Sequence, residues 1–465
     1  MSVRGILRSA AYVPYGRLDR SEIADFFSGS ASEGQRSVAA HDEDTVTMGF
    51  EAARPLITGK DLSEPASIWF STANPPYMEK TNANVIHSAL QLPESTNAFD
   101  FGGGLKSGIG ALRAAIASTD QILLIQADIR NGLPSGEDES SGGDAAAALL
   151  IGDENDGPLL ARYIGGATLT KEFIDRWRSP KQRTSKSWES RFVESTYASL
   201  VDRAWQEALK HTGLQSEDID TMIFVGQNQR VKNQAAKTLG VRNVLDDLSQ
   251  LIGNTGSAEA SLQLVSALDN AQSGEVIAIC SLIDGVEILI FEASGIHGES
   301  SSLQDQISYG GSVSYRKFLQ WRGMLSVQPP NRPAPTRISA SAAVRESDWK
   351  HAFIASKGDQ TGLIHMPPAR VSINEEDQID GMLKEPMGNR IGTVVTFTVD
   401  HLVYSENPPV VFAVVDFEGG GRIPIEVTDI DPDDVVIGMK VIPTFRRIFT
   451  ADGIHNYFWK VRPVR

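Results

Sequence analysis

Cysteine is almost missing from this chain: Cys280 is the single cysteine among 465 residues. One cysteine excludes an internal disulfide framework. Because Cys280 lies inside an apolar run at 276–281, we expect a buried core residue there rather than a reactive thiol.

Long apolar runs are also missing. No window approaches the roughly 20 apolar residues that cross a bilayer, and the N-terminal residues lack the apolar core of a signal peptide. We therefore expect a cytoplasmic protein without a membrane partner.

Positive charge is scarce, with 43 Lys and Arg against 59 Asp and Glu and a formal net charge of −16. Nucleic-acid binding requires clustered basic residues, so a nucleic-acid partner is not expected. One local exception is the segment 176–186. It carries Arg176, Arg178, Lys181, Arg183 and Lys186. This segment is either a solvated charged loop or a site for a small phosphorylated ligand.

Strand and helix patterns alternate over the first 300 residues. Strands are predicted at 3–13, 66–71, 121–127, 145–151, 221–225, 276–281 and 286–292, and helices at 46–56, 233–239 and within 254–271. A Gly-, Ser- and acid-rich loop is predicted at 131–144, and Asp42, Glu43 and Asp44 supply acidic and capping residues before the helix at 46–56. The repeated order predicts two similar α/β halves packed as one domain.

A strand, a sharp turn and a helix are predicted over 99–112, around Gly102-Gly103-Gly104. Glycines permit backbone angles that other residues resist. Many enzymes place a nucleophile at such a helix N-terminus, where free N–H groups favour negative charge. Leu105 stands at this place and cannot attack a substrate, so the turn is built for chemistry but has no nucleophile.

The composition changes after residue 300. Four prolines between 329 and 335 predict a stiff connector. Beyond it, β-rich runs at 393–399, 409–417, 422–427, 439–447 and 455–461 predict a small barrel of the OB type. OB barrels that bind single strands need a basic groove. Acidic residues at 426–434 oppose one here, which again argues against nucleic acid.

Several motifs, in common order and spacing, resemble the thiolase superfamily, most closely 3-hydroxy-3-methylglutaryl-CoA synthases and ketoacyl synthase III. They are Tyr12-Val13-Pro14, Asp42-Glu43-Asp44, the turn at 102–112, Gln126-Ala127-Asp128-Ile129, Gly142-Gly143-Asp144, the run 235–240 and Ile252-Gly253-Asn254-Thr255. Residues 315–465 resemble a family that joins a zinc ribbon to an OB barrel. The residues on which this resemblance rests are Gly323, Pro329-Pro330, His365-Met366-Pro367-Pro368 and the ending at 457–463.

The resemblance implies a duplicated αβαβα layered domain of the α/β class, followed by a degenerate ribbon and a small OB barrel. The expected boundaries are 1–165 and 166–300 for the two halves, 301–345 for the connector, 346–385 for the ribbon and 386–465 for the barrel. The ribbon's two CxxC pairs correspond to Gly358 with Thr361 and Ser372 with Glu375. Because no thiol stands at these positions and His365 alone cannot form such a site, we expect no zinc.

The resemblance also implies where a synthase would place its catalytic residues. Its glutamate, acyl-accepting cysteine and histidine correspond to Ala73, Leu105 and Val225, so a covalent acyl-enzyme is not expected. Asn254 matches the family's oxyanion-hole asparagine, and Lys106 follows the nucleophile position. CoA or acyl-CoA is the expected ligand, and the residues expected to bind it are Arg178, Lys181, Arg183 and Arg230.

Two functions remain open from the sequence. The first is an acyl-CoA-binding subunit without synthase chemistry, working as a homodimer, with a thiolase-like protein partner, or both. The second is an enzyme that makes or breaks a carbon–carbon bond β to a thioester, as an aldolase or retro-Claisen enzyme does, without an acyl-enzyme. There, Asn254 and the turn would stabilise an enolate, and Lys106, Tyr77 or Asp128 would carry the proton. Other roles compete with proton transfer: an ion pair or a position facing CoA for Lys106, a pocket wall for Tyr77, and a cap or turn for Asp128. A helix N-cap role for Asn254 is compatible with its role at the site.

Overall fold

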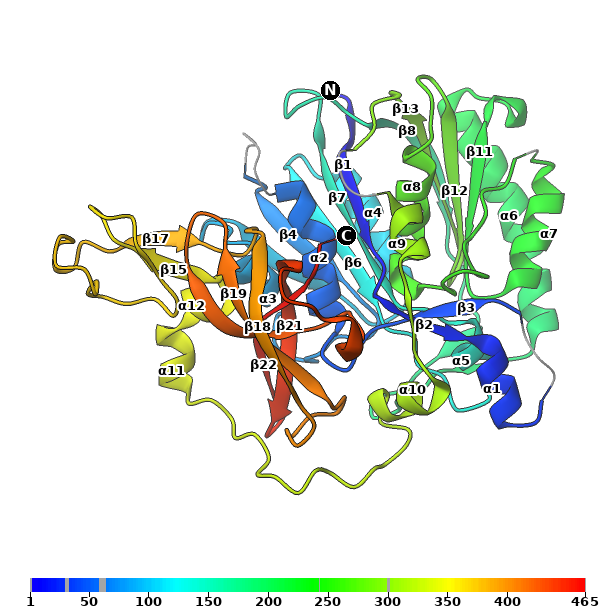
Figure 1. Cartoon of the computed structure of the whole chain (residues 1–465). Coiled ribbons are helices and arrows are strands. Elements are labelled where there is room, and N and C mark those ends of the chain that lie inside the picture. The colour runs from blue at the N-terminus through cyan, green and yellow to red at the C-terminus, as the bar shows by residue number, and fades with distance from the viewer. Residues whose placement is uncertain (1, 30–32, 58–63, 242, 299–301, 465) are drawn as a thin grey trace. The chain divides into compact units, whose positions relative to one another are not determined.

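The structure is a computed structural model that describes residues 2–29, 33–57, 64–241, 243–298 and 302–464 (Figure 1). Its internal contacts divide the chain into two units. The first unit comprises Met1–Ala39, Ala52–Asn84 and Pro93–Tyr315. The second comprises Ala40–Glu51, Val85–Leu92 and Arg316–Arg465, so it combines two early segments with the C-terminal third of the chain.

A nine-stranded sheet with the order β11-β12-β13-β8-β1-β7-β6-β4-β5 forms the centre of the first unit. Its strands are β1 (Arg4–Tyr12), β4 (Ser67–Ser71), β5 (Asn97–Phe101), β6 (Ile122–Asp128), β7 (Ala145–Asp153), β8 (Ala161–Leu169), β11 (Thr221–Val225), β12 (Val276–Leu282) and β13 (Val286–Ala293). Outward from β1 the strands follow in the order β7, β6 and β4, and outward from β8 in the order β13, β12 and β11. The sheet thus repeats one strand order on either side of the β1–β8 pair, as the alternating sequence pattern predicts.

Along β11, β12 and β13, alternate residues pack into two separate apolar cores. Ile223, Ile279 and Leu289 face the core that contains α4 (Lys106–Ala117) and α8 (Glu259–Leu268). Phe224 and Cys280 face the core formed with α6 (Ser190–Thr212) and α7 (Gln229–Leu239). The strands are therefore covered on both faces, which explains their nearly continuous apolar sequences. Burial raises the pKa of the Cys280 thiol to about 12, which confirms its prediction as a core residue.

Shorter elements complete the first unit. They are β2 (Gly16–Asp19), α1 (Arg20–Phe26), β3 (Gln35–Val38), α5 (Glu137–Ser141), β9 (Arg176–Trp177), β10 (Lys186–Ser187), η1 (Ser216–Asp218), η2 (Gly256–Ala258), α9 (Leu303–Ser308) and β14 (Gly311–Ser312). Helices α2 (Thr45–Ile57) and α3 (Ala83–Ala89) each run from one unit into the other.

The second unit contains a closed five-stranded barrel, ordered β18-β19-β20-β22-β21. The barrel strands are β18 (Gly392–Asp400), β19 (Val410–Phe417), β20 (Arg422–Val427), β21 (Lys440–Ala451) and β22 (Ile454–Pro463). Each predicted β-rich run overlaps one of these strands. The unit also contains α10 (Tyr315–Trp321), α11 (Ala340–Arg345), α12 (Ser347–Ala352), η3 (Pro432–Asp434) and a small sheet of β15 (Ile354–Lys357), β16 (Ile364–His365) and β17 (Leu383–Pro386).

Several local predictions need correction. The predicted loop at 131–144 contains α5, whose first turn carries Glu137, Asp138 and Glu139 where acidic residues favour a helix start. Strand β8 and the long helix α6 were not predicted. The connector 301–345 contains α9, β14, α10 and α11, and 322–339 is its longest described stretch without helix or strand. The five domain boundaries stay a prediction.

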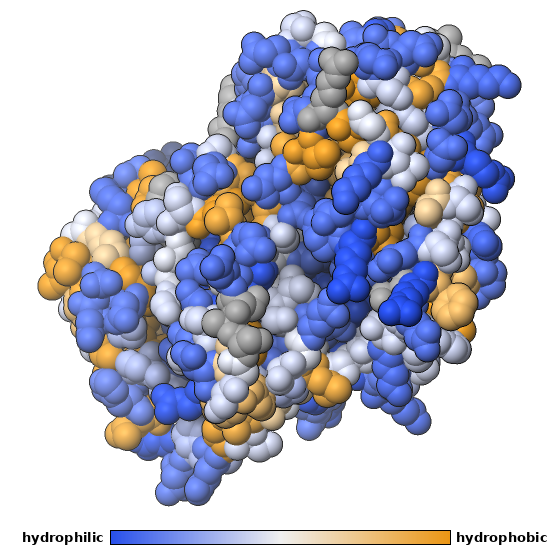
Figure 2. All heavy atoms as spheres, turned by 90° about the vertical axis from the view of Figure 1, so that its right-hand side faces the viewer, coloured by the Kyte–Doolittle hydropathy of each residue, from blue (hydrophilic) through white to orange (hydrophobic). Residues whose placement is uncertain are grey.

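The surface shown in Figure 2 is mostly hydrophilic, and its hydrophobic residues lie in separate small groups. Within the described residues, every helix is too short or too polar to cross a bilayer.

A carboxylate holds together the small sheet's loops, where the ribbon resemblance would place zinc ligands. Asp377 accepts hydrogen bonds from the Thr361 backbone N–H at 2.9 Å and from the Thr361 hydroxyl at 2.7 Å. A Cβ added to Gly358 would lie 2.2 Å from the Asp377 carboxylate. The described residues contain no group of three or more His, Cys, Asp or Glu that could hold a metal. These side chains do not fit zinc, and the absence of zinc stays a prediction.

We expect Asp377→Asn to destabilise the second unit most strongly above pH 4. Hydrogen bonds from Ser372 and Thr361 lower the Asp377 pKa to about 2, whereas an unfolded aspartate titrates near ~3.9. A carboxyl group whose pKa is lowered by folding stabilises the fold at pH values above its pKa in the unfolded chain. This contribution disappears as the pH falls from about 4 to about 2. Urea unfolding of both proteins at several pH values measures it. A difference that stays constant between pH 6 and pH 2.5 would contradict the assignment.

Candidate functional site

The glycine turn leaves the N-terminus of α4 open. Strand β5 ends at Phe101, α4 begins at Lys106, and Gly103 has a φ of 104°, a left-handed conformation that favours glycine. Nothing lies within 4 Å of a Cβ built on Gly103 or Gly104. Leu105 is the N-cap residue of α4 and makes no side-chain cap. A ligand can therefore reach the backbone of this turn.

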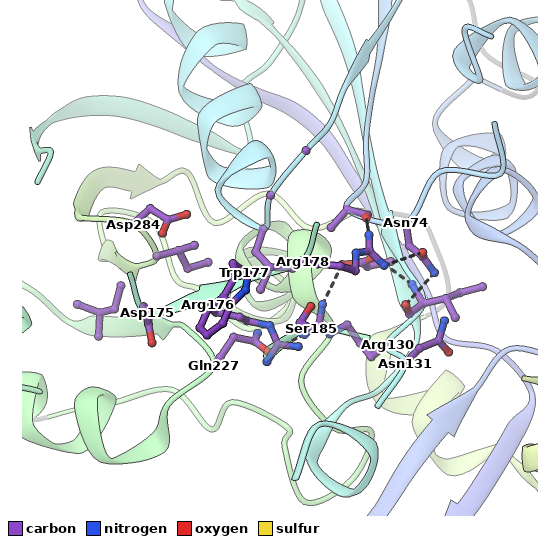
Figure 3. Close-up of a pocket in the computed structure, with 18 residues that line it drawn as sticks. Asn74, Arg130, Asn131, Asp175, Arg176, Trp177, Arg178, Ser185, Gln227 and Asp284 are labelled. Atoms are coloured by element: carbon purple, nitrogen blue, oxygen red, sulfur yellow. Dashed lines mark hydrogen bonds and ion pairs between the residues drawn. The ribbon is translucent and has the colours of Figure 1, made fainter. Parts of the chain in front are cut away.

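A pocket of about 270 Å³ lies at this turn (Figure 3). Its lining combines the turn with residues after the ends of β4, β6, β11 and β12 and with the segment that contains β9. The lining residues are Ala73, Asn74, Gly103, Gly104, Leu105, Asp128, Ile129, Arg130, Asn131, Asp175, Arg176, Trp177, Arg178, Ser185, Gln227, Leu282, Ile283 and Asp284. The size suits an acyl group and part of its carrier rather than a whole coenzyme.

The pocket brings together two of the three positions that the resemblance assigns to a synthase's catalytic residues. Ala73 and Leu105 both line it. Val225 does not line it, because it is a core residue at the end of β11 with 1% of its surface exposed. Gln227, two residues later, lines the pocket instead.

Asn254 does not line the pocket, and its side-chain amide is hydrogen-bonded to three neighbouring groups. Its Nδ2 donates to the Gly226 carbonyl at 3.1 Å, and its Oδ1 accepts from the Gly256 N–H at 3.0 Å and from Gln227 Nε2. The N-cap prediction is wrong: Thr255 and Ala258 precede η2 and α8, and neither makes a side-chain cap. Asn254 thus holds Gln227, whose side chain reaches the pocket.

Lys106 is tied to the pocket rim rather than pointing into the pocket. Its Nζ donates to the Asp284 carbonyl at 2.7 Å, across the turn between β12 and β13. Tyr77 does not line the pocket. Its backbone pairs with the Asn82 side chain, with the Tyr77 N–H donating at 3.1 Å. The Lys106 ammonium thus bonds a backbone carbonyl, and its charge also acts on the Asp284 carboxyl group and lowers its pKa against the effect of burial.

Asp128 and Arg130 form the buried floor of the pocket. Asp128 is fully buried, and its Oδ2 lies 3.5 Å from Arg130 Nη1. Burial raises the Asp128 pKa, against the opposing charge of Arg130. Arg130 Nη2 also donates to Gln227 Oε1 at 2.7 Å. The backbone N–H groups of Ser257 and Ile129 both donate to the Asp128 carboxylate, at 3.2 Å, so a turn role for Asp128 fits these contacts.

The predicted cationic residues divide into two groups. Arg178 lines the pocket, where it donates to the Ala73 carbonyl and, at 3.3 Å, to Asn74 Oδ1. Lys181, Arg183 and Arg230 are exposed and do not line it. Arg176 also lines the pocket, but both oxygens of Asp138 neutralise its guanidinium.

Sequence reasoning missed two acidic residues of the pocket, Asp175 and Asp284. Asp175 directly precedes the basic segment 176–186, whose positive charges indicated a phosphate site rather than an acidic one. Asp284 precedes Gly285 in the turn between two strands, and an Asp-Gly pair in such a place is an ordinary turn signal. Their pocket position follows only from the folded chain.

The sheet duplication and the glycine turn define a thiolase-like synthase fold, and solved structures agree. An HMG-CoA synthase complexed with CoA superposes with a TM-score of 0.62 at 17% identity, covering 72% of this chain and 94% of that one. MvaS in complex with 3-hydroxy-3-methylglutaryl coenzyme A gives 0.57 at 18% identity, covering 72% and 95%.

The sequence relatives name the family within this class. The hydroxymethylglutaryl-CoA synthase of Pyrococcus horikoshii is 30% identical over 292 residues, which cover 60% of this chain and 83% of that protein. The Pyrococcus furiosus enzyme is 29% identical over the same shares. The chain belongs to the hydroxymethylglutaryl-CoA synthase family. Residues 385–446 match the model of the ChsH2 C-terminal OB-fold domain, which confirms the OB prediction.

Proposed function

We propose that this protein binds acyl-CoA at the α4 turn but does not form the covalent acyl-enzyme of a synthase. The observation that carries the proposal is the pocket itself, which places Ala73 and Leu105 beside the open backbone of Gly103 and Gly104. Neither side chain can transfer a proton or attack a thioester. The fold that positions an acyl thioester is kept, and the groups for covalent catalysis are not.

We place the CoA phosphates outside the pocket, on the exposed cations. The pocket holds an acyl group and its adjoining atoms, so the nucleotide end must lie on the surface. Arg183 and Lys181 follow the lining residue Arg178 along the chain, and Arg230 follows the lining residue Gln227. These cations supply what phosphate needs in an otherwise acidic protein.

Calorimetry with acetyl-CoA tests this placement. We expect Arg183→Ala and Arg230→Ala each to weaken binding by about threefold to tenfold, and the loss to shrink as salt screens the charges. Arg422→Ala is the matched control, because Arg422 is an exposed barrel arginine paired with Asp416. Unchanged affinity in both variants would refute the phosphate site, and no binding of any acyl-CoA at millimolar concentration would refute the proposed function.

Intact-mass measurement after incubation with acetyl-CoA tests the missing acyl-enzyme. We expect no acetyl adduct on the natural protein and no 3-hydroxy-3-methylglutaryl-CoA synthase activity. Leu105→Cys is the control, because it places a thiol at a helix N-terminus, where the pKa of a thiol falls; we expect an adduct on this variant. An adduct on the natural protein would contradict the proposal.

We further infer that the protein works as a homodimer, with a thiolase-like partner, or both. Strand β5 is the last strand of the sheet, and its Phe99 is 51% exposed. Such an edge offers backbone groups and apolar surface to another chain. Purification of the native protein from its source, followed by mass spectrometry, identifies what is bound.

A further inference from the structure

Two aspartates from distant parts of the chain meet at one end of the pocket. Asp175 immediately precedes β9, and Asp284 lies in the turn between β12 and β13. Figure 3 shows both at the same end, away from Asn74, Arg130 and Asn131 at the other. The pocket therefore has an acidic end and a cationic end.

One buried tyrosine hydroxyl interacts with both aspartates. Tyr197 is 1% exposed, and its hydroxyl donates to Asp175 Oδ2 at 3.4 Å. Burial raises the pKa of this hydroxyl, and the negative charges of Asp175 and Asp284 raise it further. The Asp175 carbonyl accepts from the Trp188 N–H at 2.9 Å, and the Asp284 carbonyl accepts from Lys106. The backbone of each aspartate is thus held in place, and both residues line the pocket.

The surroundings favour a shared proton. Burial raises the pKa of Asp175, and the negative charge of Asp284 raises it further. Burial also raises the pKa of Asp284, opposed by the Lys106 ammonium. Because the charge of Asp284 acts on Asp175, ionisation of one carboxyl group disfavours ionisation of the other. Such a pair offers a base and an acid at once.

The glycine turn supplies the complementary element. The backbone N–H groups of Gly103 and Gly104 have no acceptor within the part of the chain that the structure describes. Both glycines line the pocket and precede the positive N-terminal end of α4. Free N–H groups in such a place stabilise the oxyanion of a thioester enolate.

We propose that Asp175 and Asp284 form a general acid–base pair that cleaves or forms the Cα–Cβ bond of a β-hydroxyacyl thioester. In the cleavage direction, the ionised carboxyl takes the proton of the β-hydroxyl group. The O–H electrons form the new C=O bond, the Cα–Cβ bond breaks, and its electron pair enters the thioester enolate. The protonated carboxyl then gives its proton to Cα. The products are a ketone or aldehyde and a shorter acyl thioester.

This step balances without any co-reactant, because one carboxyl gains the proton that the other loses. It needs neither a nucleophile at Leu105 nor a base at Ala73. The proposal rests on the proposed acyl-CoA binding and gives that site a substrate class. It selects the second of the two functions that the sequence leaves open, with carboxyl groups that the sequence does not single out.

Two assays on the full chain test the pair. The first follows deuterium incorporation at C2 of propionyl-CoA in D₂O, and the second follows acetaldehyde release from 3-hydroxybutyryl-CoA. General acid–base groups contribute about 10²- to 10⁴-fold to rates. We expect exchange at least 100-fold above buffer, and a loss of at least 100-fold in Asp175→Asn and in Asp284→Asn. Glu154→Gln, which changes an exposed acid outside the pocket, is expected to match the natural protein.

Affinity for propionyl-CoA, measured by calorimetry on each variant, separates the two proposals. We expect it to change by less than threefold, since asparagine keeps an acceptor for Tyr197 and tolerates the left-handed φ of 48° at Asp284. If the natural protein binds propionyl-CoA but catalyses neither reaction, the acid–base pair is refuted and the binding function stands. If both variants bind and still catalyse exchange at the natural rate, the pair is also refuted. If no acyl-CoA binds, the proposed function itself fails.

Discussion

Arg446→Met is expected to lower the free energy of unfolding of the second unit by about 3–5 kcal/mol, the usual cost of removing one partner from a buried ion pair. The Arg446 side chain is fully buried and lies against two carboxylates, Glu43 and, at 2.7 Å, Asp429. Removing the guanidinium leaves both acids buried without their cation. Urea unfolding followed by tryptophan fluorescence measures the loss, because Trp459 lies in the same unit.

A matched substitution separates this effect from the general loss of an arginine. Arg422 pairs with Asp416, but both side chains are well exposed, at 61% and 43%. Arg422→Met is therefore expected to cost less than about 1 kcal/mol, because exposed pairs contribute little. Equal losses in the two variants would show that burial of the Arg446 network does not matter.

The fragment 316–465, expressed alone, is expected not to fold. Three contacts of its barrel depend on residues 40–51, which belong to the same unit. Lys460 Nζ lies 2.8 Å from Asp42 Oδ2, the Tyr457 hydroxyl donates to Asp44 Oδ2 at 2.7 Å, and the Thr444 hydroxyl donates to Glu51 Oε1 at 2.9 Å. Lys460 is 2% exposed, so the fragment would bury an ammonium with one partner fewer. The combined cost approaches the whole stability of a typical domain, about 5–15 kcal/mol.

Adding the missing segments tests whether they are the cause. We expect a fragment that joins 38–57 and 83–93 to 316–465 through flexible linkers to show cooperative thermal unfolding by circular dichroism. The same fragment with Asp42→Asn and Glu43→Gln is expected to melt at a clearly lower temperature. A folded 316–465 with a melting temperature equal to that of the extended fragment would contradict the dependence.

The order of motifs along the chain sufficed to predict the duplicated sheet and the barrel, because both depend on local patterns. Alternating apolar runs identify strands, and Gly102-Gly103-Gly104 identifies the turn that opens α4. The pocket positions of Ala73 and Leu105 also followed from their motifs. Asp175 and Asp284 did not, since 109 positions separate them in sequence and only the tertiary fold brings them to one pocket.

The acidic run Asp42-Glu43-Asp44 shows a second limit of sequence reasoning. The capping prediction is confirmed for Asp44, whose Oδ1 accepts from the N–H groups of Val46 and Thr47 at 3.0 Å. Asp42 and Glu43, however, form ion pairs with the barrel residues Lys460 and Arg446. Their partners follow some 400 residues later, and no local pattern indicates such a distance.

This separation has a consequence for the protein during its synthesis. Tyr457 and Asp44 lie 413 residues apart in the chain, so the acidic segment meets this partner only after the ribosome has added all the residues between them. Until then Asp42, Glu43 and Asp44 stay hydrated on the nascent chain, which their charge makes favourable. The first unit can assemble while translation continues, whereas the barrel reaches its native contacts last and slowly, because such distant residues must first find each other. A nascent chain that stops before β22 would therefore expose an incomplete barrel to chaperones and proteases.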